Sequence, residues 1–489
     1  MTIYKTKVLN IWNKDNNQII LLFFISILAV YYLPLLLNQL IFLVFLFLAY
    51  RSKKDYFWIA FFFILIDTPG RLFQGGELTD IQRTAFYPIT SGVVLTFNEL
   101  FIFIYLFKTF VKKRKYHFVF KNDFVFLLFY TFIVLIYSLI LGMSTDIIIA
   151  TYRILLPWSI IYIITKLFIK ESDFDNFNRL LFPIVFLALI SQAFSYLTGN
   201  YLSYFLKGVS FDSDSLMIGA LAEKASRAAD SSLILIYCFT QALFYLFSKR
   251  QVFSRIYLYL IISISVFSVF LSATRGWIIA FLFILLIVFI TSRKSKNIKY
   301  IISIGVVVFI VIAMSSVFFP MVNVQIKNVT NRMNTIAALA EGDITAEGTL
   351  SRLDVRSPLV MNKFKESPII GYGFSKEYFE HCDGHVGHQN ILLNVGIIGY
   401  IILNFFYFKW CIRIYRFSGL QSTKLKYGQD AIRILCYALI AMYIIHSLSV
   451  QSWGWHIVTS KILFYSLLFA FFNIVYKHSV LSNKKLINE

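Results

Sequence analysis

Residues 351–400 read SRLDVRSPLVMNKFKESPIIGYGFSKEYFEHCDGHVGHQNILLNVGIIGY, and they form the polar centre of an otherwise apolar chain. Three of the protein's seven histidines lie in this stretch, at His381, His385 and His388. Glycine often marks turns and loops, and the glycines here are Gly371, Gly373, Gly384, Gly387, Gly396 and Gly399. We therefore expect the stretch to begin as a folded polar loop and not as a lipid-facing helix.

The composition places the rest of the chain in a membrane. Of the 489 residues, 58% are hydrophobic, 18% are aromatic and only 15% are charged. Soluble domains contain about 45–50% apolar and about 25% charged residues. The composition therefore excludes a soluble multidomain protein and predicts an all-α, polytopic integral membrane protein.

The net charge and the cysteines exclude two further classes of protein. A net charge of +21 would suggest a nucleic-acid partner in a soluble protein, but here it is explained by basic loops that orient membrane helices. No nucleic-acid partner is expected. The four cysteines show no paired spacing, so no disulfide framework is expected either.

About fourteen apolar runs approach or reach the length that crosses about 30 Å of hydrocarbon. They lie near residues 18–34, 35–50, 55–68, 88–111, 123–143, 151–169, 177–197, 230–248, 256–272, 276–292, 299–319, 388–409, 431–450 and 456–476. The first three are short and Pro34 separates two of them, so we expect about 12–14 transmembrane helices. The first run lacks a small-residue cleavage site, which predicts an uncleaved helix.

Clusters of lysine and arginine predict the orientation. If the spans alternate, the clusters near residues 51–55, 112–115, 249–255, 292–299 and 409–427 and the C-terminal lysines fall on one side, which the positive-inside rule makes cytoplasmic. Three parts follow. Residues 1–319 form an N-terminal transmembrane bundle of about eleven spans, residues 320–387 form one long folded periplasmic loop, and residues 388–489 form C-terminal transmembrane helices and a cytoplasmic tail.

Arginines on the predicted outer side run against this rule. They are Arg71, Arg83, Arg153, Arg227, Arg275, Arg352 and Arg356. Two interpretations stay open: they snorkel or pair with aspartates such as Asp67 or Asp354, or they bind an anionic ligand, for which the planar guanidinium suits phosphate. Arg275 favours the second, because the short turn at residues 272–276 holds it close to the membrane surface.

The histidines also leave several functions open. Spacings of four and seven residues would put His381, His385 and His388 on one face of a helix. The favoured function is a general base, because imidazole titrates near neutral pH and accepts a proton from a hydroxyl. Together with Cys382 and Asp383 they would also supply metal ligands, although no zinc spacing such as H-E-x-x-H is present. Solvated loop residues are the third interpretation.

Several motifs together resemble the shared region of bacterial O-antigen ligases and O-antigen polymerases. They are Arg352-Leu353-Asp354, SPIIGYG at residues 367–373, the histidine segment that leads into Gly396-Ile397-Ile398-Gly399, SATRG at residues 272–276, and Arg227 followed by small residues. The family pattern places an amide or serine after the histidine, at a fixed spacing before Gly-x-x-Gly. His385 has the spacing but is followed by Val386, whereas His388 is followed by Gln389 but lies closer to the glycines.

The resemblance implies a membrane glycosyltransferase at the periplasmic face of the bacterial inner membrane. Its donor would be an oligosaccharide on undecaprenyl pyrophosphate, with no metal and no other cofactor. His388, or alternatively His385, would be the catalytic base. Arg275 and Arg352 would bind the pyrophosphate, with support from Arg227 and Arg356. Direct attack by the acceptor would invert the sugar linkage.

The identity of the acceptor separates the remaining alternatives. A polymerase uses a sugar on a lipid-linked repeat unit, and a chain-length regulator protein would be a further partner; a ligase uses lipid A core. We favour the polymerase, because the chain has more expected spans than a ligase and is rich in phenylalanine and lysine. A transporter or flippase of lipid-linked sugars would concentrate polar residues at mid-membrane and show repeated halves. A non-catalytic assembly subunit is the last alternative.

Overall fold

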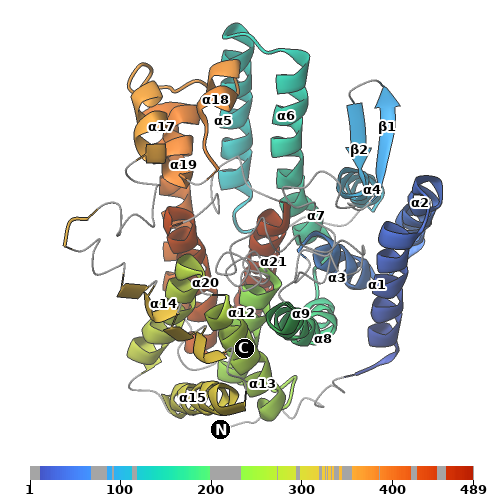
Figure 1. Ribbon diagram of the computed structural model, residues 1–489, viewed down its shortest axis with the longest axis vertical. Coiled ribbons are helices and arrows are strands. Elements are labelled where there is room, and N and C mark those ends of the chain that lie inside the picture. Colours follow the sequence, from blue (N-terminus) through green and yellow to red (C-terminus); the bar gives the residue numbers. More distant parts are fainter. Residues whose placement is uncertain are drawn as a thin grey trace.

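The computed structural model describes residues 12–67, 85–90, 93–112, 118–198, 233–272, 274–292, 298–318, 355–384, 386–419, 427–448 and 459–487, with short pieces between 322 and 343. Most of these residues are helical, and the helices pack into one bundle (Figure 1). The predicted all-α, polytopic membrane fold is confirmed.

The helices follow the apolar runs of the sequence. They are α1 (Lys14–Tyr32), α2 (Leu35–Arg51), α3 (Asp55–Ile66), α4 (Phe97–Val111), α5 (Lys121–Ile140), α6 (Thr145–Leu155), η2 (Leu156–Trp158), α7 (Ser159–Leu167), α8 (Glu171–Leu181), α9 (Ile184–Thr198), α12 (Leu233–Phe247), α13 (Arg255–Leu271), α14 (Arg275–Ser292), α15 (Ile298–Phe318), α17 (Ser357–Phe364), α18 (Lys376–His381), α19 (Gly387–Gly419), α20 (Gln429–Leu448) and α21 (Thr459–Ile487). Apart from the start of the run at residues 88–111, each predicted apolar run overlaps one helix or consecutive helices. Helices are expected there because a backbone in hydrocarbon must satisfy its own hydrogen bonds.

Eight helical segments among the described residues are long and apolar enough to cross a membrane. Four further apolar helices, α2, α3, α12 and α13, are shorter. The chain is therefore a multi-pass membrane protein, and the total of 12–14 spans stays a prediction.

One predicted run is wrong at its start. Residues 88–111 were expected to form a single helix, but β1 (Phe86–Thr90) and β2 (Val93–Thr96) pair as an antiparallel hairpin before α4 begins at Phe97. The β-branched residues of this segment favour strands. The helix begins where Thr96 and Glu99 form a reciprocal capping box, with each side chain accepting from the backbone N–H of the other residue.

Ion pairs and hydrogen bonds gather the basic clusters at one end of the bundle. The contacts are Lys54–Asp15 (2.6 Å), Lys108–Asp55 (2.7 Å), Lys112–Asp55 (2.7 Å), Asn16 Nδ2 to Arg179 O (3.1 Å) and Arg250–Asp175. They join ends of α1 to α4 with α8 and with the segment that follows α12. The clusters near residues 54, 112 and 250 thus share one end, as the charge pattern predicted. The assignment of that end to the cytoplasm stays a prediction.

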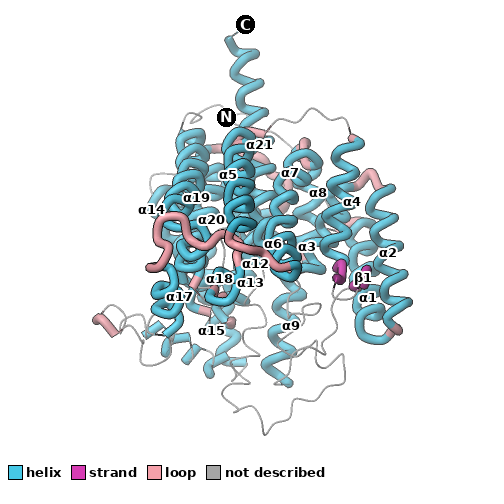
Figure 2. The backbone as a smooth tube through the Cα atoms, turned by 90° about the horizontal axis from the view of Figure 1, so that it is seen from above, coloured by secondary structure: helices cyan, strands magenta, loops and turns pink. Residues whose placement is uncertain are grey.

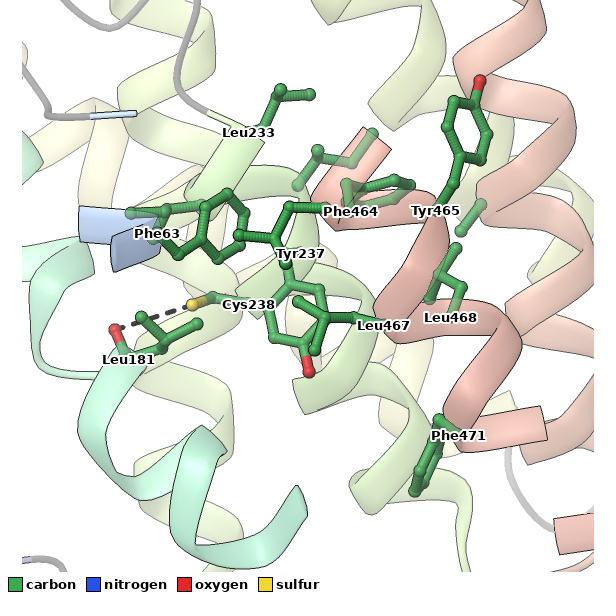
Figure 3. Packing of buried hydrophobic residues seen from close by; sticks show 14 of the residues in the cluster. Phe63, Leu181, Leu233, Tyr237, Cys238, Phe464, Tyr465, Leu467, Leu468 and Phe471 are labelled. Atoms are coloured by element: carbon green, nitrogen blue, oxygen red, sulfur yellow. Dashed lines mark hydrogen bonds between the residues drawn. The ribbon is translucent and has the colours of Figure 1, made fainter. Parts of the chain in front are cut away.

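The centre of the bundle is built on α12, whose fifteen residues are all buried. Figure 3 shows Tyr237 of this helix between Phe63 of α3 and Phe464 of α21, with edge-to-face ring contacts on both sides. Beside it, Cys238 Sγ donates to Leu181 O at 3.6 Å. This close aromatic packing stabilises the contacts of α12 with α3 and α21 at the centre of the bundle.

The long loop contributes α17 and α18, which lie at the end of the bundle opposite the C-terminal end of α21 (Figure 2). Helix α17 contacts α19, and the segment between α17 and α18 contacts the last residues of α5. This corner contains the described part of the stretch at residues 351–400.

Candidate functional site

Helix α19 is interrupted at Gly396, where φ is +63° and ψ is −170°. In a regular helix, the N–H groups of Ile397 and Ile398 would donate to the carbonyls of Leu393 and Asn394. Here they donate instead to Pro368 O (2.9 Å) and Ile369 O (3.2 Å). The interruption therefore frees two carbonyls in the first part of α19.

The SPIIGYG segment supplies the missing partners for both carbonyls. The N–H of Tyr372 donates to Leu393 O (2.9 Å), and the N–H of Gly373 donates to Asn394 O (2.7 Å). Together with the bonds accepted by Pro368 and Ile369, four hydrogen bonds insert this segment into the helix. Buried backbone groups must be paired, so each of the two motifs requires the other.

Glycine is required at the points where these two backbones meet. A Cβ atom on Gly371 would lie 2.6 Å from Asn394 O, and one on Gly396 would collide with the carbonyl of Ile369. Both residues also have positive φ, which other residues adopt only at a cost. The glycines of the sequence motif thus serve close backbone approach.

Helix α5 holds the inserted segment from its other side. Ser138 Oγ accepts from the N–H of Phe374 (2.7 Å), and Tyr137 OH donates to Gly371 O (3.2 Å). Asn394 Nδ2 donates to Gly373 O (2.5 Å). Sequence reasoning did not identify Ser138 or Asn394, because their partners are backbone groups far away in the chain.

His388 lies in the first turn of α19 and is half-buried. Its Nε2 is 3.1 Å from Ser447 Oγ near the end of α20, and its Nδ1 is 3.3 Å from the hydroxyl of Tyr400. The ring also contacts Tyr443 of α20, with centroids 5.0 Å apart. The predicted base is therefore held at both nitrogens by hydroxyl groups that the sequence analysis had not identified.

Two polar contacts join the start of α17 to the start of α19. Arg356 Nη1 lies 3.3 Å from Asp383 Oδ1, and Gln389 Nε2 donates to Ser357 Oγ (3.2 Å). Asn390 accepts from the N–H of Asp383 at 3.0 Å and caps the turn. Arg356, predicted as a phosphate ligand, is thus part of an ion pair on a half-exposed surface.

Arg275 begins α14 and is half-buried. Short connections make α12, α13 and α14 run in alternating directions. The ring of Phe244, near the end of α12, contacts the ring of Tyr427, just before α20, with centroids 5.6 Å apart. Helix α20 therefore begins at the end of the bundle where α12 ends. Helices α14 and α20 are therefore antiparallel. The start of α14 lies at the same end of the bundle as Ser447, which contacts His388.

The remaining predicted site residues are placed differently. Arg227, Arg352 and His385 lie outside the described residues, so their roles stay predictions. His381 ends α18, and its Nδ1 donates to Glu377 O at 2.9 Å. His381 and His388 do not share one helix face, because the segment between them is not one helix: α18 ends at His381 and a new helix starts at Gly387.

Arg153 also has partners within the protein. Its Nε lies 3.2 Å from Glu99 Oε1, and its Nη2 donates to Val94 O in the hairpin. The pairing interpretation therefore fits this arginine. Within the described part of the chain, no group of three histidine, cysteine, aspartate or glutamate side chains has a metal-binding arrangement.

A charged cluster joins α17 and α18 outside the membrane-spanning helices. Lys363 Nζ lies 2.8 Å from Glu366 Oε2 and 2.9 Å from Glu377 Oε2. Hydrogen bonds from Lys363 lower the pKa of both carboxyl groups, and those bonds raise the pKa of the lysine. Tyr372 OH is 3.1 Å from Glu366, so the cluster connects directly to the inserted segment.

Comparison with known proteins identifies one family. Residues 258–404 match the model of the O-antigen ligase family. The matched region runs from α13 to the second part of α19 and contains Arg275, the SPIIGYG segment, His388 and Gly396. A search of curated proteins found no match. The family match supports a place in the superfamily of O-antigen polymerases and ligases. Arg227 and helix α20 lie outside the matched residues.

Proposed function

We propose, from the O-antigen ligase match over residues 258–404, that this membrane protein transfers a glycan from undecaprenyl pyrophosphate to a sugar hydroxyl. The observation that carries the proposal is His388, which is fixed at both nitrogens at the start of an interrupted helix. The end of α14 that bears Arg275 faces the same side of the bundle. A base and a phosphate-binding side chain are the two groups that this reaction requires.

The reaction needs little covalent chemistry from the protein. The oxygen of the acceptor hydroxyl attacks the anomeric carbon, the bond from that carbon to the pyrophosphate breaks, and its electron pair leaves with the pyrophosphate. His388 accepts the hydroxyl proton, a contribution of about 10²–10⁴-fold for a general base. Attack opposite to the leaving group inverts the linkage.

Positive side chains stabilise the charge that develops on the leaving pyrophosphate. We assign this role to Arg275 and Arg352, with Arg227 and Arg356 in support. Arg356 would exchange part of its contact with Asp383 for a phosphate oxygen, which its half-exposed position permits. His385 remains the alternative base.

Among possible acceptors we favour the next lipid-linked repeat unit, which makes the protein a polysaccharide polymerase of the bacterial inner membrane. The basic end of the bundle then faces the cytoplasm, and the corner formed by α17, α18 and α19 faces the periplasm. A chain-length regulator protein is a further partner in this account. Transfer to lipid A core is the second candidate, because the matched family is described as O-antigen ligase.

A reconstitution assay separates these functions. Purified protein in proteoliposomes receives the lipid-linked repeat unit alone or together with lipid A core. Chain growth without core supports the polymerase, and product only with core supports the ligase. Movement of the intact donor between leaflets without any new glycosidic bond would instead indicate a flippase.

The arginine assignment has a matched control. Arg275→Lys keeps the charge but removes the planar fork that binds two phosphate oxygens, so transfer should fall by about tenfold or more. Arg153→Lys changes another arginine predicted on the outer side, whose partners are Glu99 and Val94, and should retain most activity. Equal activity of the two variants would contradict the role of Arg275.

A further inference from the structure

Two basic side chains gather on one aromatic ring at the basic end of the bundle. Arg255, the first residue of α13, and Lys299, the second residue of α15, lie 5.2 and 5.5 Å from the centroid of the Tyr300 ring. Both cations are exposed. The ring attracts each of them, but the two like charges repel each other. The arrangement therefore favours an anion beside the pair.

The protein itself does not neutralise these two charges. Neither Arg255 nor Lys299 forms an ion pair with a carboxylate in the part of the chain that the structure describes. The side-chain amide of Gln251, a neutral group, lies 3.0 Å from Nη2 and 3.2 Å from Nε of Arg255. Arg250 of the same segment is paired with Asp175. The corner at Arg255 and Lys299 thus keeps its positive charge.

An apolar groove opens beside this corner. It lies between α14 and α15, has a volume of about 610 Å³ and is lined only by apolar residues. Its wall on α15 contains Ile301 and Ile304, which follow Lys299 by two and five residues. At 1.5 Å per residue, this wall begins within about 3–8 Å of the lysine along the helix axis. Its wall on α14 reaches Phe289, close to the end of that helix at Ser292.

The length of the groove suits one hydrocarbon chain of a lipid. Its residues on α14 run from Ile279 to Phe289, which corresponds to about 15 Å of helix. The hydrocarbon core of a bilayer is about 30 Å thick, so the groove crosses about half of this thickness. A positive corner above an apolar groove has the two surfaces that an anionic amphiphile requires.

We propose that Arg255, Lys299 and the groove bind one anionic phospholipid from the leaflet at the basic end of the bundle. Its phosphate contacts the guanidinium and the ammonium group, and one acyl chain fills the groove between α14 and α15. The cytoplasmic leaflet contains anionic lipids, which agrees with the orientation proposed above. This site lies at the other end of the bundle from His388, and its occupancy does not depend on glycan transfer.

The bound lipid completes the packing of α15. Helix α15 packs against α13 and α14 (Figure 1), but of its described side chains only Ile301 and Ile304 are buried. An acyl chain in the groove adds contacts that join α15 to α14. We therefore expect the lipid to stabilise this pair of helices.

The first test measures the preference for an anionic headgroup by native mass spectrometry of the detergent-solubilised protein. Phosphatidylglycerol should bind about 25-fold more tightly than phosphatidylcholine, because each basic side chain contributes a factor of about five. Arg255→Gln or Lys299→Gln should each lower the preference about fivefold, and the double variant should abolish it. A preference that persists in the double variant would overturn the proposal.

A matched control excludes a general effect of surface charge. Arg413 is also exposed and lies over an aromatic ring, that of Phe120 at 5.4 Å, but its Nη1 donates to Val119 O. Arg413→Gln should therefore keep the preference for phosphatidylglycerol. Equal losses in Arg413→Gln and Arg255→Gln would also overturn the proposal.

A photoreactive lipid locates the chain. Phosphatidylglycerol with a diazirine on one acyl chain, reconstituted with the protein in vesicles, should label α14 and the first turns of α15 more strongly than α5, whose lipid-facing residues include Leu128. Equal labelling of α5 would indicate ordinary contact with the bilayer and would contradict a specific site. Stronger labelling of the groove by a photoreactive polyprenyl phosphate would assign the groove to the donor lipid instead, and this result would likewise overturn the proposal.

Discussion

Replacing Gly396 by alanine tests whether the inserted SPIIGYG segment organises the site. The new Cβ would collide with the carbonyl of Ile369, and a positive φ costs a non-glycine residue about 1–2 kcal/mol. If the segment is expelled, four backbone hydrogen bonds are lost, each worth about 0.5–1.5 kcal/mol. The local cost is therefore about 3–8 kcal/mol, which is large for one methyl group.

Hydrogen exchange measures this cost directly. The amides of Tyr372, Gly373, Ile397 and Ile398 should exchange at least about 100-fold faster in Gly396→Ala, because each 1.4 kcal/mol corresponds to a factor of about ten. Glycan transfer should be lost as well. Gly305→Ala is the matched control, since a Cβ there meets nothing within 4 Å. Unchanged protection of these amides in Gly396→Ala would refute the insertion account.

Three further predictions concern the surroundings of this segment. Ser138→Ala leaves the buried N–H of Phe374 without its acceptor and should destabilise the corner by about 1–3 kcal/mol, seen as faster exchange of that amide. Asp383→Asn removes the charge that competes for Arg356 and should lower KM for the donor up to about threefold if this arginine binds phosphate. The hydrogen bond from Lys363 lowers the pKa of Glu377. This contact is therefore fully present above the ordinary glutamate pKa and is lost as the pH falls through the lowered value, so protection of α18 should decrease as the pH falls below the ordinary glutamate pKa.

Each of these predictions has its own control and contradiction. Ser303→Ala removes an exposed hydroxyl of α15 that donates to Lys299 O and makes no hydrogen bond to the described residues of the corner, so it should leave exchange at Phe374 unchanged. Asp383→Asn that raises KM would mean that Asp383 supports donor binding instead of competing with it. Lys363→Met should abolish the acid-dependent loss of protection, after correction for intrinsic exchange rates, and a loss that persists would assign it to other groups.

The sequence predicted the helices well because apolar length is a local property. Apart from the start of the run at residues 88–111, the apolar runs became helices, and the basic clusters near residues 54, 112 and 250 met at one end. The hairpin at residues 86–96 was missed, because hydropathy alone does not distinguish a short apolar strand from the first turns of an apolar helix. Only the capping pair Thr96 and Glu99 marked the true start of α4.

The sequence offered candidate residues for the site, whose roles stay predictions, but not the geometry that surrounds them. The motifs that contain Gly371 and Gly396 were recognised, yet the four hydrogen bonds between them depend on which segments meet in space. The partners of His388 lie 12 and 59 residues away, at Tyr400 and Ser447, and hydroxyl residues on apolar helices are too common to be identified singly. A spacing of four residues between Tyr443 and Ser447 places both on one helix face, and this spacing was the signal in the sequence that could have pointed to α20 as a neighbour of His388.

The central claim is that His388 accepts the proton while a glycan leaves its lipid pyrophosphate. The most direct measurement follows purified protein in proteoliposomes with a lipid-linked repeat unit and quantifies, by mass spectrometry, both the new glycosidic bond and the released lipid pyrophosphate. The account predicts equal amounts of the two products, reduced by about 10²-fold or more in His388→Ala and little changed in His381→Ala. Equal yields from His388→Ala and the unchanged protein would contradict it.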